Sequence, residues 1–473
     1  MEKQRFPGGV WERMSPEALG IRPAALLDML RRIHRRGADL HSLLVIRHGA
    51  LAFEYYAPGY GPETGHQMYS VSKTFCSMTV GAAQARGLLS LEDPVLKYFP
   101  EADPGPEDGP LRRMKIRHLL TMSTGHLADP YLTDEGWRPD RAAKFFETPV
   151  LREPGSEFRY ETGASFLLSA IVTRVTGMTA LEAANKWFLD RIGAGSCQWS
   201  ASAEGYSAGG TGMTVRAEDM ARFGLLLLRY GLWEGEQLLP EDYVRAAASW
   251  QIHSVPPGVP EYKLEARQGY GYQTWMCSFG AWRADGACGQ LIVMIPHLDM
   301  VVTADCAMDN REANLLVDAL RDGLLPGVVS EPVPAEPGER GALAGYLARR
   351  ADPSMPEEAV LHTGEWRFDP AASPLGLRRL VLTEETVTLD WDWVSGTFAW
   401  KWNIPAPTGL VIPSGGMGAG SQAAVSMRWE SRPVLRVHAM GTGRTEELRL
   451  PGPGHPGFFL KSSAYGEHPL SPL

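Results

Sequence analysis

Cysteine is scarce in this sequence, and its distribution excludes the protein classes that depend on it. The five cysteines are scattered, odd in number and form no Cys-x-x-Cys pair, so the sequence indicates neither a disulfide framework nor a cysteine-based metal site. Cys76 and Cys288 lack a patterned histidine partner and are interpreted as small buried hydrophobic residues rather than as nucleophiles. Reduced thiols are typical of the cytoplasm, which we therefore expect as the location.

Long apolar runs and an excess of positive charge are also missing. No run of about 18 apolar residues occurs, so no membrane-spanning helix is predicted. The first residues are charged and interrupted by Pro and Gly, unlike a secretory signal. The formal net charge of −9 gives no reason to expect nucleic acid or an anionic membrane as a partner.

Neither a metal ion nor any other cofactor is predicted. The histidines that most suggest a metal site are His34, His41 and His48, which are spaced seven residues apart. The residue pattern changes from helical to strand-like between them, so these three side chains cannot share one face of one element.

A chain of 473 residues is long enough for two or three domains. Apolar periodicity predicts a helix over residues 22–37, and residues 42–59 have the pattern of two strands joined at a His-Gly turn. Residues 111–250 are mainly helical in pattern, and strand-like segments return between residues 269 and 307. This order predicts a sheet layered with helices and an inserted helical subdomain, about residues 67–250, with a cleft between the two.

The last third of the chain has a different pattern. Residues 325–341 are rich in Pro and Gly and are interpreted as a linker. Beyond them, short segments of alternating apolar and polar residues are separated by turn signals, which predicts a small antiparallel barrel or sandwich. We therefore divide the chain into a larger domain, residues 1–335, and a C-terminal β-domain, residues 336–473.

The stretch Ser70-Val71-Ser72-Lys73 places a serine three residues before a lysine. On a helix the two side chains lie on one face, and a buried lysine with a lowered pKa could take the serine proton. A helix start would also direct backbone amides at developing negative charge. The alternative is that Ser70 caps the helix while Lys73 lies in solvent. The following residues have a pattern that is buried nearly all round, which favours the catalytic interpretation.

Other segments occur in an order that supports that interpretation. Together with the Ser70 stretch, they resemble the serine β-lactamase and penicillin-binding-protein-like family, most of all its class C β-lactamase-related branch, over about residues 40–325. The segments are RHLLTMSTGH (117–126), FRYETGASFLLSAIVTRVTG (158–177), GGTGMTVRAEDMARFGLLLLRYGLWEGEQLLP (209–240), YGYQTW (270–275) and ADGACGQLIVMIPHLDMVV (284–302). The resemblance implies an α/β (α+β) fold in which helices flank an antiparallel sheet, so that residues 1–335 form a β-lactamase-like catalytic domain.

The resemblance also implies roles for individual residues. Ser70 would attack a carbonyl to form an acyl-enzyme, and Lys73 and Tyr160 would share the proton transfers. The backbone N–H groups of Ser70 and Ala287 would form the oxyanion hole. For Tyr160, the alternative is a core aromatic beside Phe158.

Two departures from the family pattern bear on the substrate. Thr162 stands where the family usually has Asn, and Ala284-Asp285-Gly286 stands where it usually has Lys-Thr-Gly or His-x-Gly. The basic residue that would meet a β-lactam or peptide carboxylate is missing, so efficient β-lactamase or DD-carboxypeptidase activity is not expected. Asp285 would suit a substrate with a free ammonium, as in the family's D-aminopeptidases and aminohexanoate-oligomer hydrolases, unless it is a solvated residue that faces away.

The resulting hypothesis is a serine hydrolase that cleaves an ester or small amide through acyl-Ser70. A homodimer is the assembly considered for it. Thr162, Asp285, Gly286 and His126 are the candidate substrate-binding residues. Trp275 and Tyr272 are candidates for the pocket wall, although aromatics at strand spacing are more often core. The competing hypothesis from another class is a non-catalytic member of the fold that binds an acyl compound or acts as a scaffold.

Overall fold

The structure is a computed structural model in which the chain divides into two compact units. The first comprises residues 1–19, 44–54 and 67–304, and the second comprises residues 20–43, 55–66 and 305–473. No single helix among the described residues is long and apolar enough to cross a bilayer; one bent pair, Thr162–Thr176 with Ala180–Leu189, passes that test by length and composition only. The described residues are 5–131, 139–255, 264–308, 312, 314–351, 363–370, 376–391, 395–400, 405–412, 421–429, 433–440, 444–451, 458–462 and 466–470.

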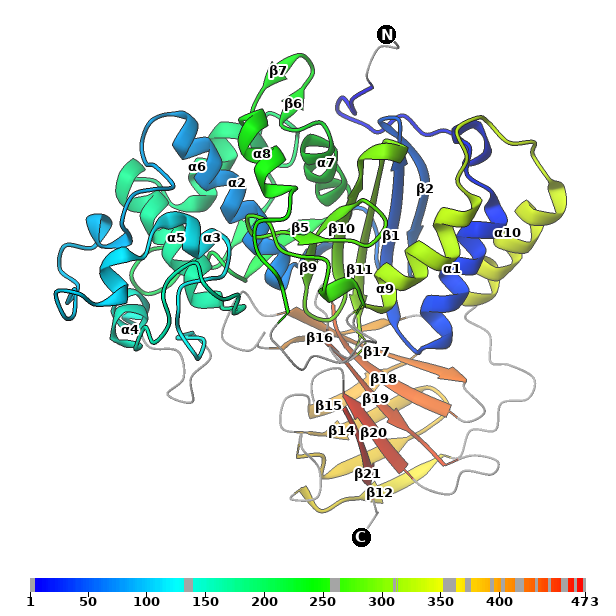
Figure 1. Cartoon of the computed structure of the whole chain (residues 1–473). Coiled ribbons are helices and arrows are strands. Elements are labelled where there is room, and N and C mark those ends of the chain that lie inside the picture. The colour runs from blue at the N-terminus through cyan, green and yellow to red at the C-terminus, as the bar shows by residue number, and fades with distance from the viewer. Residues whose placement is uncertain are drawn as a thin grey trace. The chain divides into compact units, whose positions relative to one another are not determined.

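A six-stranded sheet forms the centre of the residues that precede the C-terminal strands (Figure 1). Neighbouring strands pair antiparallel from β8 to β11, and every residue of β10 and β11 is buried. This burial explains the nearly continuous apolar run of β10, because a strand covered on both faces does not alternate. The strand order is β2 (Ala50–Tyr56), β1 (Asp39–Arg47), β11 (Met300–Ala307), β10 (Gln290–Ile295), β9 (Trp282–Gly286) and β8 (Trp275–Met276).

Helices and short strands make up the rest of the first unit. Helix α2 (Ser72–Ala85) is buried from Ser72 to Ala83, and its small side chains allow α5 (Thr162–Thr176) and α6 (Ala180–Ala184) to pack closely against it. Helix α7 (Ala217–Leu228) packs on β10 through Gly224. The remaining elements are α3 (Ile116–Leu120), α4 (Arg141–Glu147), α8 (Glu241–Ala247), β3 (Gly65–Gln67), β4 (Gln198–Trp199), β5 (Met213–Arg216), β6 (Leu232–Trp233) and β7 (Glu236–Gln237).

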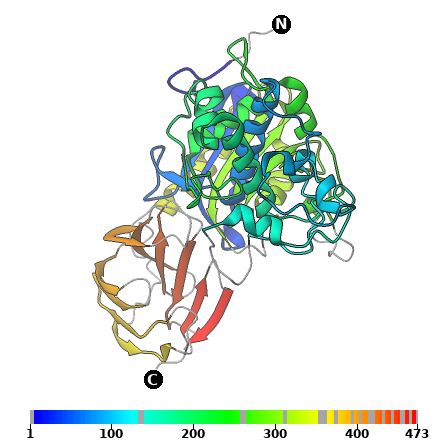
Figure 2. The ribbon, with the colours of Figure 1, turned by 90° about the vertical axis from the view of Figure 1, so that its left-hand side faces the viewer.

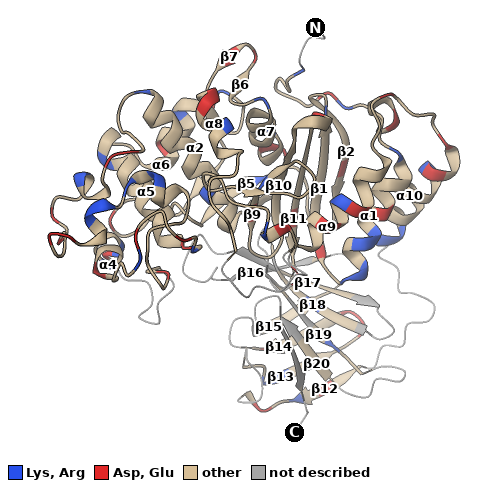
Figure 3. Cartoon of the chain, in the orientation of Figure 1, with Lys and Arg blue, Asp and Glu red and all other residues tan. Residues whose placement is uncertain are grey.

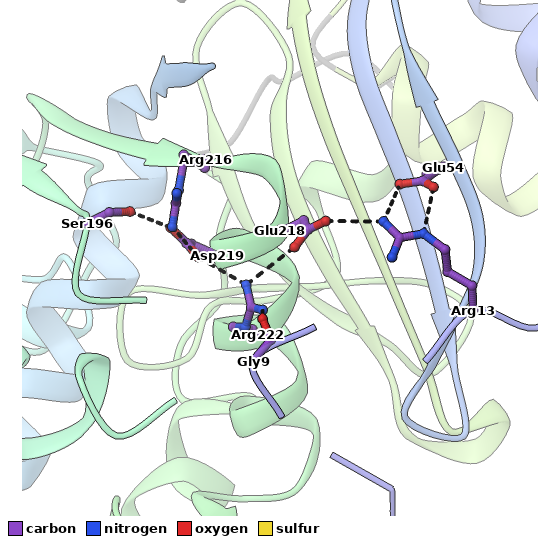
Figure 4. A network of polar contacts seen from close by, with 8 residues as sticks. All are labelled: Gly9, Arg13, Glu54, Ser196, Arg216, Glu218, Asp219 and Arg222. Atoms are coloured by element: carbon purple, nitrogen blue, oxygen red, sulfur yellow. Dashed lines mark hydrogen bonds and ion pairs between the residues drawn. The ribbon is translucent and has the colours of Figure 1, made fainter. Parts of the chain in front are cut away.

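A network of ion pairs connects the N-terminal segment, β2 and α7 (Figure 4). Arg13 bonds Glu54 at 2.9 Å and reaches Glu218 at 3.5 Å. On the next turn of α7, Arg222 lies 3.3 Å from the fully buried carboxylate of Asp219. The charges of the chain otherwise lie mainly on helices and loops, and the central strands carry few of them (Figure 3).

Among its described residues, the second unit contains three α-helices and two further sheets. Helix α1 (Pro23–Arg35) packs against α9 (Leu315–Ala319) and α10 (Pro337–Ala351). Both C-terminal sheets, drawn from yellow to red in Figure 2, are antiparallel. They share one hydrophobic cluster that includes Trp391, Val425 and Leu460. Their strands are β12 (Gly364–Arg367), β13 (Arg379–Leu382), β14 (Thr386–Asp390) and β15 (Ser395–Ala399), then β16 (Ala406–Ile412), β17 (Ser421–Trp429), β18 (Pro433–Ala439), β19 (Arg444–Arg449), β20 (Phe458–Ser462) and β21 (Gly466–Leu470).

The second unit also holds a buried polar cluster around Asp39. The Asp39 carboxylate pairs with Arg436 of β18 and lies 3.3 Å from His41 Nε2. His41 Nδ1 in turn lies 2.8 Å from Nε2 of His66, and both imidazoles are buried. These cationic and hydrogen-bonding neighbours hold the pKa of Asp39 well below its usual value, against the opposing effect of burial.

The predicted fold class is confirmed: helices flank an antiparallel sheet, a helical region is inserted, and antiparallel sheets follow at the C-terminus. The predicted helix over residues 22–37 and the following strand pair are α1, β1 and β2. The linker predicted over residues 325–341 differs from the structure, because α10 begins within this stretch at Pro337. Pro at a first helical position is compatible with a helix start, so the Pro-rich composition did not exclude one. The domain boundary between residues 335 and 336 stays a prediction.

Candidate active site

Ser70 and Lys73 meet at the start of the buried helix. Ser70 lies in the 3₁₀ turn Tyr69–Val71, which runs directly into α2. The Lys73 Nζ donates to Ser70 Oγ at 3.1 Å, and the lysine is only 1% exposed whereas the serine is partly exposed. The alternative in which Ser70 caps the helix and Lys73 lies in solvent is therefore wrong. Instead, a hydroxyl open to a substrate lies beside an amine shielded from water.

Three oxygen atoms surround the Lys73 amine. Besides Ser70 Oγ, these are Thr162 Oγ1 at 3.3 Å and the Gly210 carbonyl at 2.8 Å. Burial lowers the pKa of Lys73 to about 7, although the charge of Asp129 works in the opposite direction. Once neutral, the amine has two N–H donors for Thr162 and Gly210, and its lone pair is left for the Ser70 proton.

Tyr160 lies on the other side of the amine. The Lys73 Nζ is 4.9 Å from the centre of its ring. Burial raises the pKa of Tyr160 far above its ordinary value, although the nearby Ser70 hydroxyl works in the opposite direction. The tyrosine therefore keeps its proton near neutral pH and suits the role of acid, while Lys73 suits the role of base. The ring also stacks on Trp275, at 5.5 Å between centroids.

Two functional groups in this cluster were not identified from the sequence. Asp129 accepts the first two N–H groups of α5, from Thr162 at 2.6 Å and from Gly163 at 3.1 Å, and so fixes the helix start that presents Thr162. Gly210 supplies its carbonyl to Lys73, and a Cβ at Gly210 would lie 3.2 Å from the amine. The Gly-Gly-Thr-Gly segment was a signal for Gly210, but nothing local connects Asp129 with residues more than thirty positions later.

Strand β9 brings the third motif against the nucleophile. A Cβ on Gly286 would lie 2.4 Å from the Met68 carbonyl and 3.3 Å from Val71, so only glycine permits this approach. Ala287 follows at the hairpin to β10, where its own carbonyl accepts from Gln290 at 3.2 Å. Tyr69, before Ser70, and Cys288, after Ala287, both have positive φ, at 45° and 62°. The two residues whose N–H groups are expected to form the oxyanion hole therefore each have a strained neighbour in the chain.

Asp285 forms an ion pair with Arg283. Its Oδ2 accepts from Arg283 Nε at 2.9 Å, and both residues lie on one face of β9. The Arg283 side chain is 2% exposed and also donates to the carbonyls of Glu265 and Met276. Asp285 retains 20% side-chain exposure, so its carboxylate, and not the guanidinium, is the group that a ligand can reach.

His126 forms a buried pair with Glu161, the residue between Tyr160 and Thr162. Its Nδ1 lies 3.1 Å from Glu161 Oε2, and neither side chain has any exposed surface. Burial raises the pKa of Glu161 even though His126 opposes the shift. The structure therefore places His126 behind the tyrosine segment, where it packs edge-on against Phe145, instead of on an open cleft wall.

The remaining sequence candidates lie in different surroundings. Cys76 is fully buried, and burial raises the pKa of its thiol to about 12, which fits the hydrophobic interpretation. Cys288 is also buried. Tyr272 packs against Tyr243, whereas Trp275 lies at the site through Tyr160. Among the described residues, no group of three or more His, Cys, Asp or Glu side chains could hold a metal ion.

Comparison with known proteins shows the family to which this chain belongs. The family model described as Beta-lactamase matches residues 31–324, which is more than half of the chain. The chain belongs to the β-lactamase family. The match contains every residue of the cluster around Ser70, and it agrees with the resemblance expected from the motifs.

Two curated relatives in this family are enzymes by name. The chain is 28% identical over 236 residues to a 6-aminohexanoate-dimer hydrolase from Paenarthrobacter ureafaciens, covering 47% of this chain and 59% of that protein. It is 27% identical over 179 residues to the esterase EstB from Burkholderia gladioli, covering 33% of this chain and 45% of that protein. The chain thus spans about half the length of each of these two relatives.

A solved structure extends the likeness of fold beyond the family match. The octameric penicillin-binding protein homologue from Pyrococcus abyssi is similar with a TM-score of 0.50 at 15% identity, covering 94% of this chain and 99% of that one. At that identity the similarity concerns the fold alone. It includes the C-terminal sheets, which lie outside the residues of the family match.

Proposed function

We propose that this protein is a serine hydrolase that cleaves an ester or small amide through a covalent acyl-Ser70 intermediate. The observation that carries the proposal is the Lys73 amine, which is buried and lies 3.1 Å from the Ser70 hydroxyl. Burial lowers its pKa to about 7, so the neutral amine can accept the serine proton near neutral pH. Lys73 takes the proton as Ser70 attacks, Tyr160 supplies a proton to the leaving group and regains one from protonated Lys73, and Ser70 and Ala287 N–H stabilise the oxyanion. Water then hydrolyses acyl-Ser70, which releases the acid and restores the serine. Relatives named as an esterase and a 6-aminohexanoate-dimer hydrolase support this reaction class.

Mass spectrometry of the intact protein after treatment with a fluorophosphonate tests the nucleophile. We expect one adduct, located on Ser70 by peptide mapping, and loss of p-nitrophenyl ester hydrolysis in Ser70→Ala. Ser72→Ala is the matched control, because the Ser72 hydroxyl only accepts a backbone N–H from Met213 at 3.2 Å. Labelling of another residue, or full activity in Ser70→Ala, would refute the proposal. A wild-type protein that neither forms an adduct nor hydrolyses the ester would instead favour a non-catalytic binding protein.

The substrate is proposed to lack an essential carboxylate and to present a hydrogen-bond donor, such as an ammonium, to Asp285. The third motif, Ala284-Asp285-Gly286, contains no basic residue, and Ala284 is buried. The side chain of the preceding Arg283 is only 2% exposed, so it does not supply the missing positive charge. The name of the 6-aminohexanoate-dimer hydrolase relative supports an amino-terminated amide. Hydrolysis of such an amide should be faster than hydrolysis of its N-acetylated form, and equal rates would contradict this assignment. A penicillin should acylate Ser70 poorly or not at all.

The location and assembly remain proposals. A cytoplasmic location is supported by the five free cysteines, all of them buried, and a homodimer is proposed for the intact chain. Light scattering on the purified protein measures its mass directly, and a monomeric mass at micromolar concentration would contradict the homodimer.

A further inference from the structure

A second cavity lies in the helical part of the first unit, and the catalytic groups do not line it. Its volume is about 750 Å³, and its walls come from the loop of residues 99–111, helix α4 and the segment 148–150, with Arg174 and Glu204. Ser70, Lys73 and Tyr160 are absent from its lining. A cavity of this size is large enough for a small organic molecule.

The walls of this cavity are largely apolar. Phe99 and Phe146 lie with ring centroids 5.0 Å apart, and Leu111 and Val150 also contribute to the lining. Aromatic and aliphatic walls favour a ligand with a hydrocarbon part, and the face of an aromatic ring also attracts a cation.

The charged side chains of the lining are mostly acidic. Glu101, Asp103, Glu147 and Glu204 face a single guanidinium, that of Arg174. This guanidinium is already engaged, because it pairs with Glu101, donates to the Tyr98 carbonyl at 2.8 Å and lies 4.2 Å from the Phe99 ring centre. Among the described residues that line the cavity, a ligand carboxylate would therefore meet excess negative charge and no cation that is not already paired.

Glu204 is the carboxylate that most clearly lacks a partner. Its Oε1 accepts from the Ala142 backbone N–H at 3.0 Å, which ties it to the first turn of α4. Its Oε2 is buried and has no hydrogen-bond partner among the residues that the structure describes. Arg141 is near enough for an electrostatic interaction with Glu204. Because no donor compensates this oxygen, the Glu204 carboxylate adds uncompensated negative charge beside the cavity.

We propose that this cavity binds a hydrophobic organic monocation, an alkyl- or arylammonium, with the hydrocarbon against Phe99 and Phe146 and the ammonium at Glu204 and Asp103. The site does not depend on the chemistry at Ser70. It is a separate binding site on the molecule, and the acidic side chains of its own lining determine its preference for a cation.

Isothermal titration calorimetry of the full chain with hexylammonium chloride tests the proposal, with sodium hexanoate as a probe of equal length and opposite charge. We expect hexylammonium to bind about tenfold or more tightly than hexanoate, with an affinity that falls as salt is added. Equal affinities, or no measurable heat with hexylammonium, would overturn the proposal.

Three conservative variants locate the bound probe. Glu204→Gln and Asp103→Asn retain an acceptor oxygen for the Ala142 and Gly105 amides, and each should weaken hexylammonium about three- to tenfold. Glu107→Gln, an exposed neighbour outside the lining, should leave the affinity unchanged. An affinity that is unchanged in both Glu204→Gln and Asp103→Asn would put the cation outside this cavity and overturn the proposal.

Discussion

At the scale of single residues, the central feature is an amine whose burial serves chemistry at the expense of stability. Lys73 is among the largest fully buried side chains, and its pKa is lowered from 10.5 to about 7 by burial. At a pH between these two pKa values, the lysine binds fewer protons in the folded state than in the unfolded state. Its contribution to stability is therefore greatest above 10.5 and is lost as pH falls through about 7.

Replacement of Lys73 by Met should produce an inactive but more stable protein. At pH 6 the wild type must either bury a charge or release a proton, and Met at this position does neither, so we expect a gain of about 3 kcal/mol in the free energy of unfolding. The gain should shrink as pH rises toward 10. Urea denaturation at both values measures it, and a Lys73→Met protein that is less stable at pH 6 would contradict this account.

The buried His126–Glu161 pair leads to a second prediction at this scale. Glu161→Ala leaves His126 without its carboxylate in a site with no exposed surface, which should cost about 3 kcal/mol. Glu153→Ala is the matched control, because its ion pair with Arg113 is about half exposed and should be worth less than about 1 kcal/mol. Equal losses in the two variants would show that the inner pair has no special structural importance.

At the scale of elements, the approach of β9 to the Ser70 turn aligns the oxyanion donors. Gly286→Ala would place a methyl group 2.4 Å from the Met68 carbonyl, so β9 must move away. We expect a loss of about 1–3 kcal/mol in stability together with a lower kcat for ester hydrolysis. The control is Gly341→Ala in α10, where no atom lies within 4 Å of the added carbon. That variant should be more stable by about 0.5–1 kcal/mol with unchanged kcat. Unchanged kcat in Gly286→Ala would contradict the proposed role of β9.

Elements with strong periodicity were predictable from the sequence, whereas contacts between distant segments were not. The spacing of Ser70 and Lys73 predicts a shared helix face, and the structure places Lys73 Nζ 3.1 Å from Ser70 Oγ. Nothing local predicts that Asp129 holds the N-terminus of α5, or that His126 pairs with Glu161. These arrangements depend on tertiary packing, for which a single sequence carries no direct signal.

At the scale of the whole molecule, the second unit depends on charges buried around Asp39. This carboxylate lies among Arg436, His41, His438 and the Thr445 hydroxyl, and its depressed pKa means that it stabilises the fold at neutral pH and loses that effect in acid.

Removal of the Arg436 guanidinium should therefore destabilise the protein strongly. Arg436→Met leaves the Asp39 charge poorly compensated and should cost about 3 kcal/mol at pH 7. The difference in the free energy of unfolding between wild type and Arg436→Met should narrow as pH falls below about 4, because Asp39 is then protonated in the unfolded chain. Arg367→Met, at an exposed ion pair with Glu365, should change stability by less than about 0.5 kcal/mol. Equal effects in thermal denaturation would contradict a structural role for the cluster.

The measurement that tests the central claim most directly is the rate at which a fluorophosphonate labels Ser70 as a function of pH. The account predicts that the rate rises with pH through an apparent pKa of about 7, because only neutral Lys73 can accept the serine proton. Lys73→Arg, which stays charged, should label at least about a hundredfold more slowly at every pH. A rate in the wild type that is flat from pH 5 to 9, or a rate in Lys73→Arg equal to that of the wild type, would contradict the account.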